Sequence, residues 1–121
     1  MFSTDKPTLT AQVGTSIELP CNITSSLNED TAYLILWFKD KIRNPVYSVD
    51  ARLNNLTQAD HLLADNLVAR AFFNTSSPLS FLKIDPLLEE DNGDYKCRVD
   101  FKRGRTVYRM IKLNVLGKII Y

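Results

Sequence analysis

Two cysteines, each on the apolar side of an alternating segment, constrain this chain more than any other feature. Residues 17–23 and 95–101 both alternate apolar and polar side chains, with the odd positions on one face. This period of two is typical of half-buried β-strands, so Cys21 and Cys97 are expected to point into one core. Two cysteines allow one bridge or two free thiols, and their number does not decide between them.

Three tripeptides favour the bridge. Asn22, Asn55 and Asn74 each begin an N-glycosylation pattern, Asn-x-Ser/Thr, with no proline in the middle position. They indicate an extracellular, oxidising environment, in which we expect a Cys21–Cys97 disulfide. Residues 1–6 contain no apolar stretch like that of a signal peptide, so we expect a leader and a membrane anchor to lie outside this chain.

Composition excludes several classes of function. Fifteen Lys and Arg against fourteen Asp and Glu give a net charge of +1, without the basic excess of a nucleic-acid-binding domain. The single histidine, His61, lies in a polar stretch and is expected at the surface without a function. The acidic residues between 89 and 94 lack the spacing of an EF-hand. We therefore predict no enzyme, no metal or cofactor site, and no direct membrane contact by this domain.

The remaining segments are typical of short strands separated by turns. We expect strands at residues 33–39, 79–84, 95–101 and 106–115, with a turn at 102–105 between the last two. Pro86 prevents the strand at 79–84 from continuing. The sequence predicts a single all-β domain over residues 1–117, followed by the start of a linker at 118–121.

One longer motif is more specific than alternation. The pattern Leu82-x-Ile84-x-x-Leu87-x-x-x-Asp91-x-Gly93-x-Tyr95-x-Cys97 resembles the E-to-F segment of an immunoglobulin domain, and Cys21 and Trp37 complete its Cys…Trp…Cys arrangement. The resemblance implies a two-sheet Greek-key sandwich with one inter-sheet disulfide. Trp37 would pack on that bridge, and Tyr95 would form the tyrosine corner at a turn where Gly93 supplies an unusual backbone angle.

The long separation between the two cysteines suits the variable type, or V-set, with its additional C′ and C″ strands. Arg70 and Asp91 resemble the V-set pair that closes the bottom of the sandwich with a salt bridge. A disulfide closing a loop of this size contributes roughly 4–5 kcal/mol in the chain-entropy model. That contribution is a large part of the ~5–15 kcal/mol by which a domain is normally stable.

Residues that the core does not require indicate a protein-binding face. Because Trp37 points inward, its neighbours on the C strand should point outward on the G-F-C-C′ sheet. An apolar and aromatic centre with a charged margin is the composition of a protein interface. Two registers remain open for C′: Tyr47 and Val49 outward, or Val46 and Ser48. The predicted partner-binding residues are Leu36, Phe38, Tyr47, Lys96, Arg98, Asp100, Tyr108 and Met110.

At the C and C′ strands the sequence is similar to the first immunoglobulin domain of the Sidestep family, arthropod neuronal cell-surface receptors. The likeness lies in residues 35–40, 45–52, 70–73 and 95–101. It implies a membrane-distal domain that binds Beaten path family receptors through the V-set sheet, guiding axons and matching synaptic partners. Leu62 stands where the family has an aromatic residue after His61.

Other interpretations remain open. An immune-type receptor would recognise its ligand through the loops, a structural domain would pack on a sister domain, and a homophilic receptor would bind a second copy of itself. The basic turn at 102–105 is either a site for an acidic partner or sulfated glycan, or a solvated hairpin tip that deters aggregation. Glycans at Asn22 and Asn74 are expected on the sheet opposite the binding face, and one at Asn55 at its edge.

Overall fold

The computed structural model describes residues 6–76 and 79–117, so the linker predicted at 118–121 lies outside the described residues. Short 3-10 turns occur at η1 (Leu56–Gln58), η2 (Asp65–Leu67) and η3 (Glu89–Asp91). The strands of the described part are β1 (Thr8–Gln12), β2 (Ile17–Pro20), β3 (Ala32–Lys39), β4 (Tyr47–Asp50), β5 (Asp60–Leu63), β6 (Ala71–Asn74), β7 (Phe81–Ile84), β8 (Gly93–Phe101) and β9 (Val107–Leu116).

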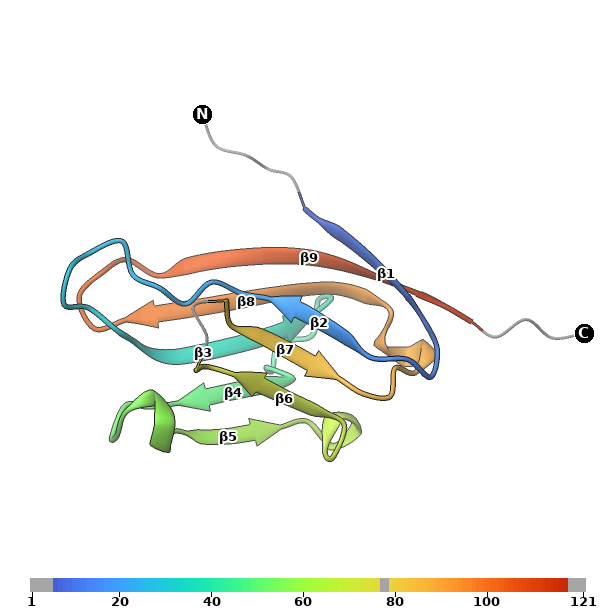
Figure 1. Ribbon diagram of the computed structural model, residues 1–121, viewed down its shortest axis with the longest axis horizontal. Coiled ribbons are helices and arrows are strands. Elements are labelled where there is room, and N and C mark those ends of the chain that lie inside the picture. The colour runs from blue at the N-terminus through green and yellow to red at the C-terminus, as the bar shows by residue number, and fades with distance from the viewer. Residues whose placement is uncertain (1–5, 77–78, 118–121) are drawn as a thin grey trace, which may run out of the picture.

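These strands form two layers. The large sheet has the order β1-β9-β8-β3-β4-β5, and the small sheet, in front of it in Figure 1, has the order β2-β7-β6. All pairings are antiparallel except that of β1 with β9, which is parallel. The predicted all-β V-set sandwich is confirmed, with β9, β8, β3, β4 and β5 as the G, F, C, C′ and C″ strands.

Two details differ from the expectation. Strand β1 was not predicted, because its alternation is weak and its partner β9 lies at the other end of the chain. Strand β2 ends at Pro20, one residue before Cys21, although the Cys21 N–H still donates to the Ser80 carbonyl at 2.9 Å. Cys21 is nevertheless buried, so the parity of the segment holds beyond the end of the regular strand.

The core lies between the sheets and is crossed by the disulfide. Cys21 and Cys97 are bonded, with their Cα atoms 6.4 Å apart. Trp37 is fully buried and stands directly opposite Cys97 in the register of β3 and β8. Its ring lies 6.0 Å from that of Phe73, on the small sheet, so the tryptophan spans both layers. Burying side chains of this size is the main source of stability in such a sandwich.

The η3 end of the sandwich is closed by an ion pair. Arg70 Nη1 lies 2.7 Å and Nη2 3.1 Å from the two carboxylate oxygens of Asp91, which is 1% exposed. Two further backbone carbonyls accept from the same guanidinium, those of Asn66 and Pro86. The hydrogen bonds to Asp91 raise the pKa of Arg70. The expected pair is therefore present, and every oxygen of the buried carboxylate is bonded.

The tyrosine corner is built on the same turn. The Tyr95 hydroxyl donates to the Asp91 carbonyl at 2.6 Å, and burial raises the pKa of Tyr95. Gly93, between them, has a φ of +149°, and a Cβ there would lie 2.6 Å from an Asp40 carboxylate oxygen. Both the backbone angle and the close approach explain why glycine occupies this position.

Candidate protein-binding face

The outer face of the large sheet carries two rows of side chains that run across its strands. Both rows follow from strand alternation, because the core takes the intervening residues Trp37, Cys97 and Val99. We call these residues the sheet-face patch. Its first row is Leu62, Ser48, Leu36, Arg98 and Tyr108, and its second row is Phe38, Lys96 and Met110.

The second row is organised around one cation. Lys96 Nζ lies 5.2 Å from the ring centroid of Phe38 and 5.5 Å from that of Tyr108. Each contact of this kind contributes about 0.5–1 kcal/mol at an exposed site. Tyr108 and Met110 remain 53% and 49% exposed, so the cluster is held in place without being covered. A preset arrangement of this sort lowers the entropy that a partner must offset on binding.

Six of the eight predicted partner-binding residues lie in the sheet-face patch, and two, Asp100 and Tyr47, do not. Asp100 has the right parity but is 7% exposed, because Arg98 donates to both its oxygens at 3.0 Å and Thr106 donates at 2.8 Å. The prediction that Asp100 contacts a partner is therefore wrong, since its carboxylate is already bonded. Its role is to hold Arg98 flat on the sheet, and the hydrogen bonds to Asp100 raise the pKa of Arg98.

Tyr47 was also misplaced. It is 1% exposed on the inner face, where its hydroxyl accepts from the Phe73 N–H at 3.0 Å and contacts His61 Nδ1. Of the two registers left open for this strand, the second is observed for Ser48, which points outward, but Val46 is buried with 7% of its surface exposed. His61 is accordingly not a free surface residue, since it lies between Tyr47 and a stacked Phe72 ring 5.3 Å away.

Leu62 was not predicted as a member of the patch, and Ser48 was predicted to point outward only in one of the two registers left open. Ser48 pairs with Leu36 on one side and with Leu62 on the other, and Leu62 is 73% exposed. The apolar centre thus extends one strand beyond the predicted face. Leu62 follows His61, which points inward, so alternation places Leu62 on the outer face. That alternation could be recognised only once the pairing of β5 with β4 was known.

The three glycosylation motifs are placed differently from one another. Asn74 ends β6 on the small sheet, and Asn55 precedes η1 in the β4–β5 connection. Asn22 was expected on the opposite sheet, well away from the face. It instead lines a groove together with Tyr108 and Met110, so a glycan there would border the sheet-face patch. The reason is that the chain leaves β2 at Pro20 and passes beside β9.

At each motif the asparagine carbonyl oxygen is already bonded within the tripeptide. Asn22 accepts from the Thr24 N–H, Asn55 from the Thr57 hydroxyl, and Asn74 from the Ser76 N–H, at 2.9, 2.6 and 2.9 Å respectively. Such hydrogen bonds fix the orientation of the side-chain amide. The geometry is thus suited to modification, which stays a prediction.

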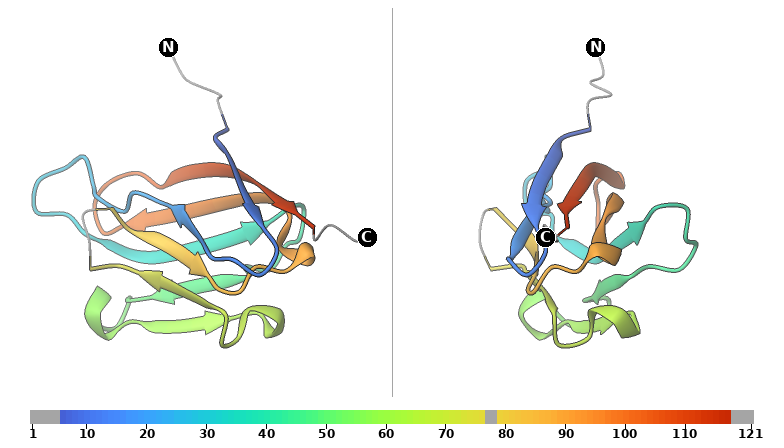
Figure 2. Two further views of the ribbon diagram at one scale, coloured as in Figure 1. Left: turned by 45° about the vertical axis from the view of Figure 1, so that its right-hand side comes forward. Right: turned by 90° about the vertical axis from the view of Figure 1, so that its right-hand side faces the viewer.

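In the described part of the chain, no element covers the sheet-face patch. The β3–β4 connection projects beyond the large sheet on the side away from the small sheet (Figure 2, right). Among the described residues there is no group of three His, Cys, Asp or Glu side chains that could hold a metal ion. The helical turns of that same part are too short and polar to cross a membrane.

Known proteins share this architecture. Residues 4–116 match the immunoglobulin V-set domain. The human "Probable non-functional immunoglobulin lambda variable 11-55" is 31% identical over 98 residues, which cover 79% of this chain and 76% of the relative. The first Ig-like domain of human CD48 antigen superposes with a TM-score of 0.70 at 25% identity, covering 96% of this chain and 86% of that one.

The extracellular domains of the voltage-gated sodium channel beta4 subunit, described as parallel homodimers, superpose with a TM-score of 0.67 at 20% identity over 98% of both chains. Domains of this kind are typically extracellular and serve protein recognition rather than catalysis. The sheet topology, the inter-sheet disulfide, the closing ion pair and the matched residues agree: this chain belongs to the immunoglobulin V-set family.

Proposed function

We propose that this domain is the recognition module of a cell-surface receptor in neuronal cell–cell recognition, and that it binds an immunoglobulin-type partner receptor of the Beaten path kind. The similarity to the Sidestep family supports the class of partner. The sheet-face patch supports the mode of binding. In this proposal the domain lies in the extracellular part of a membrane protein that guides axons or matches synaptic partners.

One observation carries the mode of binding. The patch crosses five strands and alternates apolar or aromatic side chains with polar ones, with Lys96 held between Phe38 and Tyr108 and Arg98 held by Asp100. Interface hot spots are enriched in tyrosine and arginine at the centre of a patch, where water is excluded. The two fixed cations suit a partner that carries apolar side chains with a carboxylate at the rim.

The glycans would set the borders of the interface. Asn22 borders it beside β9, and Asn55 lies in the connection at the other edge of the sheet. We therefore expect the partner to approach between these two edges, over β8 and β3. A glycan at Asn55 found lying across Phe38 would contradict this model.

The test is a binding screen of the glycosylated protein against a panel of immunoglobulin-type ectodomains that includes Beaten path receptors. Phe38→Asp should abolish the interaction found, and the thermal midpoint should stay nearly unchanged, because Phe38 is only partly buried. Val68→Asp is the matched control, since Val68 is 58% exposed in the β5–β6 connection, outside the patch. Binding that survives Phe38→Asp would exclude the sheet face.

A second copy of this chain is included in the panel, because a homophilic contact would use the same apolar surface. Sedimentation of the isolated protein at increasing concentration distinguishes the two cases. A monomer that binds a Beaten path receptor supports the proposal, whereas self-association lost on Phe38→Asp supports a homophilic receptor instead.

A further inference from the structure

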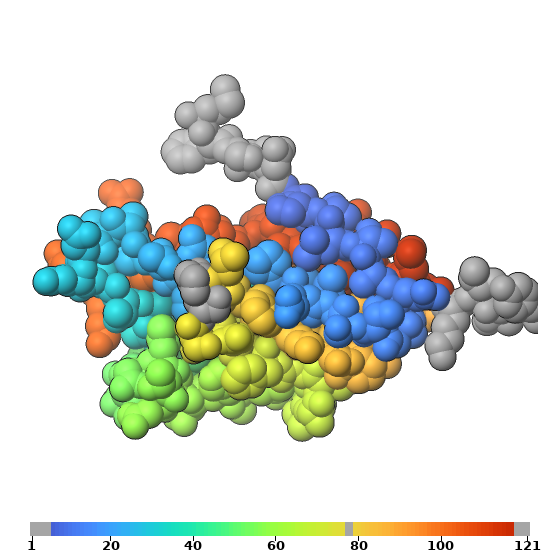
Figure 3. All heavy atoms as spheres, in the orientation of Figure 1, coloured from blue at the N-terminus to red at the C-terminus, as the bar shows by residue number. Residues whose placement is uncertain are grey.

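A second surface lies at the end of the sandwich where β8 turns into β9. The β8–β9 turn (residues 102–106) and the β2–β3 connection (residues 21–31) enclose a pocket of about 500 Å³. Its apolar lining residues are Phe101, which is buried, Val107 and the exposed Leu27. Figure 3 shows the two segments side by side at the left end of the molecule, cyan beside orange. A volume of this size is within the range of ligand sites in proteins.

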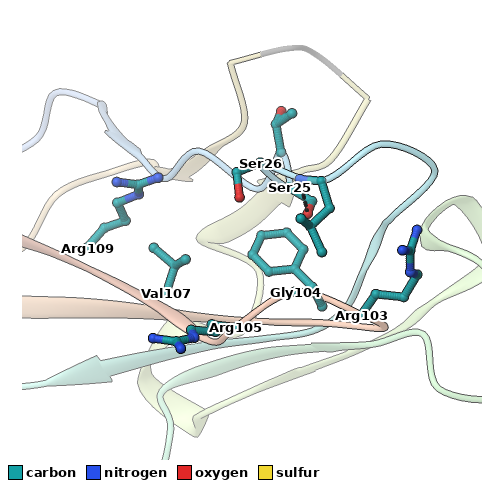
Figure 4. A pocket seen from close by; sticks show the side chains of 10 residues that line it. Ser25, Ser26, Arg103, Gly104, Arg105, Val107 and Arg109 are labelled. Carbon is teal, nitrogen blue, oxygen red and sulfur yellow. Dashed lines mark hydrogen bonds between the residues drawn. The ribbon is translucent and has the colours of Figure 1, made fainter.

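Three arginines line this pocket, and the guanidinium groups of two of them have no partner among the described residues. Arg103 Nη1 donates to the Asn28 carbonyl at 2.9 Å. The guanidinium groups of Arg105 and Arg109 make no hydrogen bond or ion pair with any residue that the structure describes. Figure 4 shows Arg109 and Val107 projecting toward the segment of Ser25 and Ser26, with the Arg105 guanidinium beside the ribbon on its other side. The pocket lining therefore combines these two guanidinium groups with the hydroxyl side chains of residues 24–26 and the apolar side chains of Leu27, Phe101 and Val107.

The position of Arg109 is unusual for a core strand. Val107 and Ile111, two residues before and after it, point toward the interior, so Arg109 occupies an inward position of β9. It stays exposed because the small sheet does not extend over this part of β9, where the β2–β3 connection runs instead. Arg109 therefore lies at the opening between the two sheets, on the inner face of β9 and not on its outer face.

The walls of the pocket are preset by one acidic side chain. Asp30 accepts from the N–H groups of Arg103 and Gly104, both at 2.8 Å, and from the Ser25 hydroxyl at 2.6 Å. A Cβ on Gly104 would lie 3.0 Å from Asp30 Oδ2, so glycine permits the close approach. Because Asp30 binds backbone and hydroxyl donors, it fixes the turn and leaves the charges of Arg105 and Arg109 available.

We propose that this pocket binds an acidic side chain of a polypeptide, a carboxylate or a tyrosine sulfate, through Arg105 and Arg109. Guanidinium groups bind such planar or tetrahedral anions with paired hydrogen bonds. The apolar lining residues suit the body of an amino-acid side chain. A sulfated glycan is the weaker fit, because long sulfated chains need an extended basic strip and the chain as a whole carries a net charge of only +1.

The test uses fluorescence anisotropy with three probes. They are a labelled hexapeptide with a sulfated tyrosine between glutamates, the same peptide with phenylalanine and glutamine at those positions, and a heparin hexasaccharide. The acidic peptide should bind, and the neutral one should not. The double variant Arg105→Gln/Arg109→Gln should lose about tenfold in affinity for each arginine, since a charged hydrogen bond is worth about one such factor.

Lys112→Gln is the control, because it removes one positive charge from β9, the strand that carries Arg109, at a position outside the pocket. Equal loss in the control and the double variant overturns the proposal, as does a failure of the acidic peptide to bind at millimolar concentration. Binding of heparin alone to the two arginines overturns the polypeptide ligand. Phe38→Asp should leave peptide binding unchanged, because Phe38 does not line the pocket. This result tests the pocket separately from the sheet-face patch.

Discussion

Two aspartates close opposite ends of this sandwich, and they use their carboxylates differently. Asp91, at the start of β8, binds the guanidinium of Arg70 and is buried. Asp30 lies in the β2–β3 connection, at the end of the sandwich where β8 turns into β9. It accepts hydrogen bonds from the backbone N–H groups of Arg103 and Gly104. In the first case the arginine side chain is hydrogen-bonded within the fold and is not available to a ligand. In the second the turn is held through its main chain, and the neighbouring arginine side chains stay available for a ligand.

The largest loss of stability should follow from removing the ion pair between Arg70 and Asp91. In Arg70→Met, the Asp91 carboxylate stays buried without its partner, and we expect the free energy of unfolding to fall by about 3–5 kcal/mol. Guanidinium chloride denaturation of the oxidised protein measures this. Arg105→Met is the control, and an equal loss in the two variants would show that the two ends do not differ.

Removing the second aspartate should have a smaller and local effect. Asp30→Ala frees the N–H groups of Arg103 and Gly104, so their amide hydrogens should exchange faster while those of β8 keep their protection. Asp60→Ala, an exposed carboxylate on β5, is the control. Unchanged exchange in the β8–β9 turn would mean that Asp30 does not fix the pocket wall.

A third contact, between His61 on β5 and Tyr47 on β4, makes the stability of the fold depend on pH. Burial lowers the pKa of His61 below its ordinary value, although Asp60 partly opposes this. Between that lowered pKa and about 6.5, the unfolded chain binds more protons than the folded one. Stability contributed by neutral His61 is therefore full above that range and lost as the pH falls through it.

The change is seen by comparing His61→Gln with the unmodified chain. The amide of glutamine can still accept from the Tyr47 hydroxyl, but it does not titrate. The loss of stability between neutral and mildly acidic pH should be smaller in the variant, measured as the shift of the chemical denaturation midpoint. Parallel pH profiles for the two proteins would contradict the assignment.

The smallest effect is expected at the free arginines. Arg105→Gln and Arg109→Gln remove no hydrogen bond within the described residues, so the free energy of unfolding should change by less than about 0.5 kcal/mol. Thermal unfolding of both variants measures this. A larger loss would mean that these guanidinium groups support the fold and are not reserved for a ligand.

The difference between the two ends also shows what a sequence can predict. Asp91, Gly93, Tyr95 and Cys97 lie close together in one segment, so its resemblance to the immunoglobulin E-to-F segment implied the turn and the tyrosine corner. The disulfide was expected from Cys21 and Cys97 together with the glycosylation motifs. The pocket at the other end brings residues 24–27 to residues 101–109. No local pattern relates these segments, because only the closed sandwich sets Asp30 against the β8–β9 turn.

The errors on the sheet face have similar causes. In the four residues from Val46 to Val49, apolar side chains occur at both parities, so alternation did not indicate that Tyr47 points inward. Asp100 has an outward parity, yet Thr106 returns across the turn and covers it. Parity thus places a side chain on a face, and only the folded neighbours decide whether a partner can reach it.

The parallel pairing of β1 with β9 has a mechanical consequence. Thr8 lies beside Lys112 and Gln12 beside Leu116, so both strands run in the same direction, and the chain enters the pair at one end and leaves it at the opposite end. A pull between the two ends loads the hydrogen bonds of the pair together, in shear, rather than opening them one after another. Tension applied between the two ends of this pair would therefore meet its first resistance at the edge of the large sheet, before the disulfide is strained.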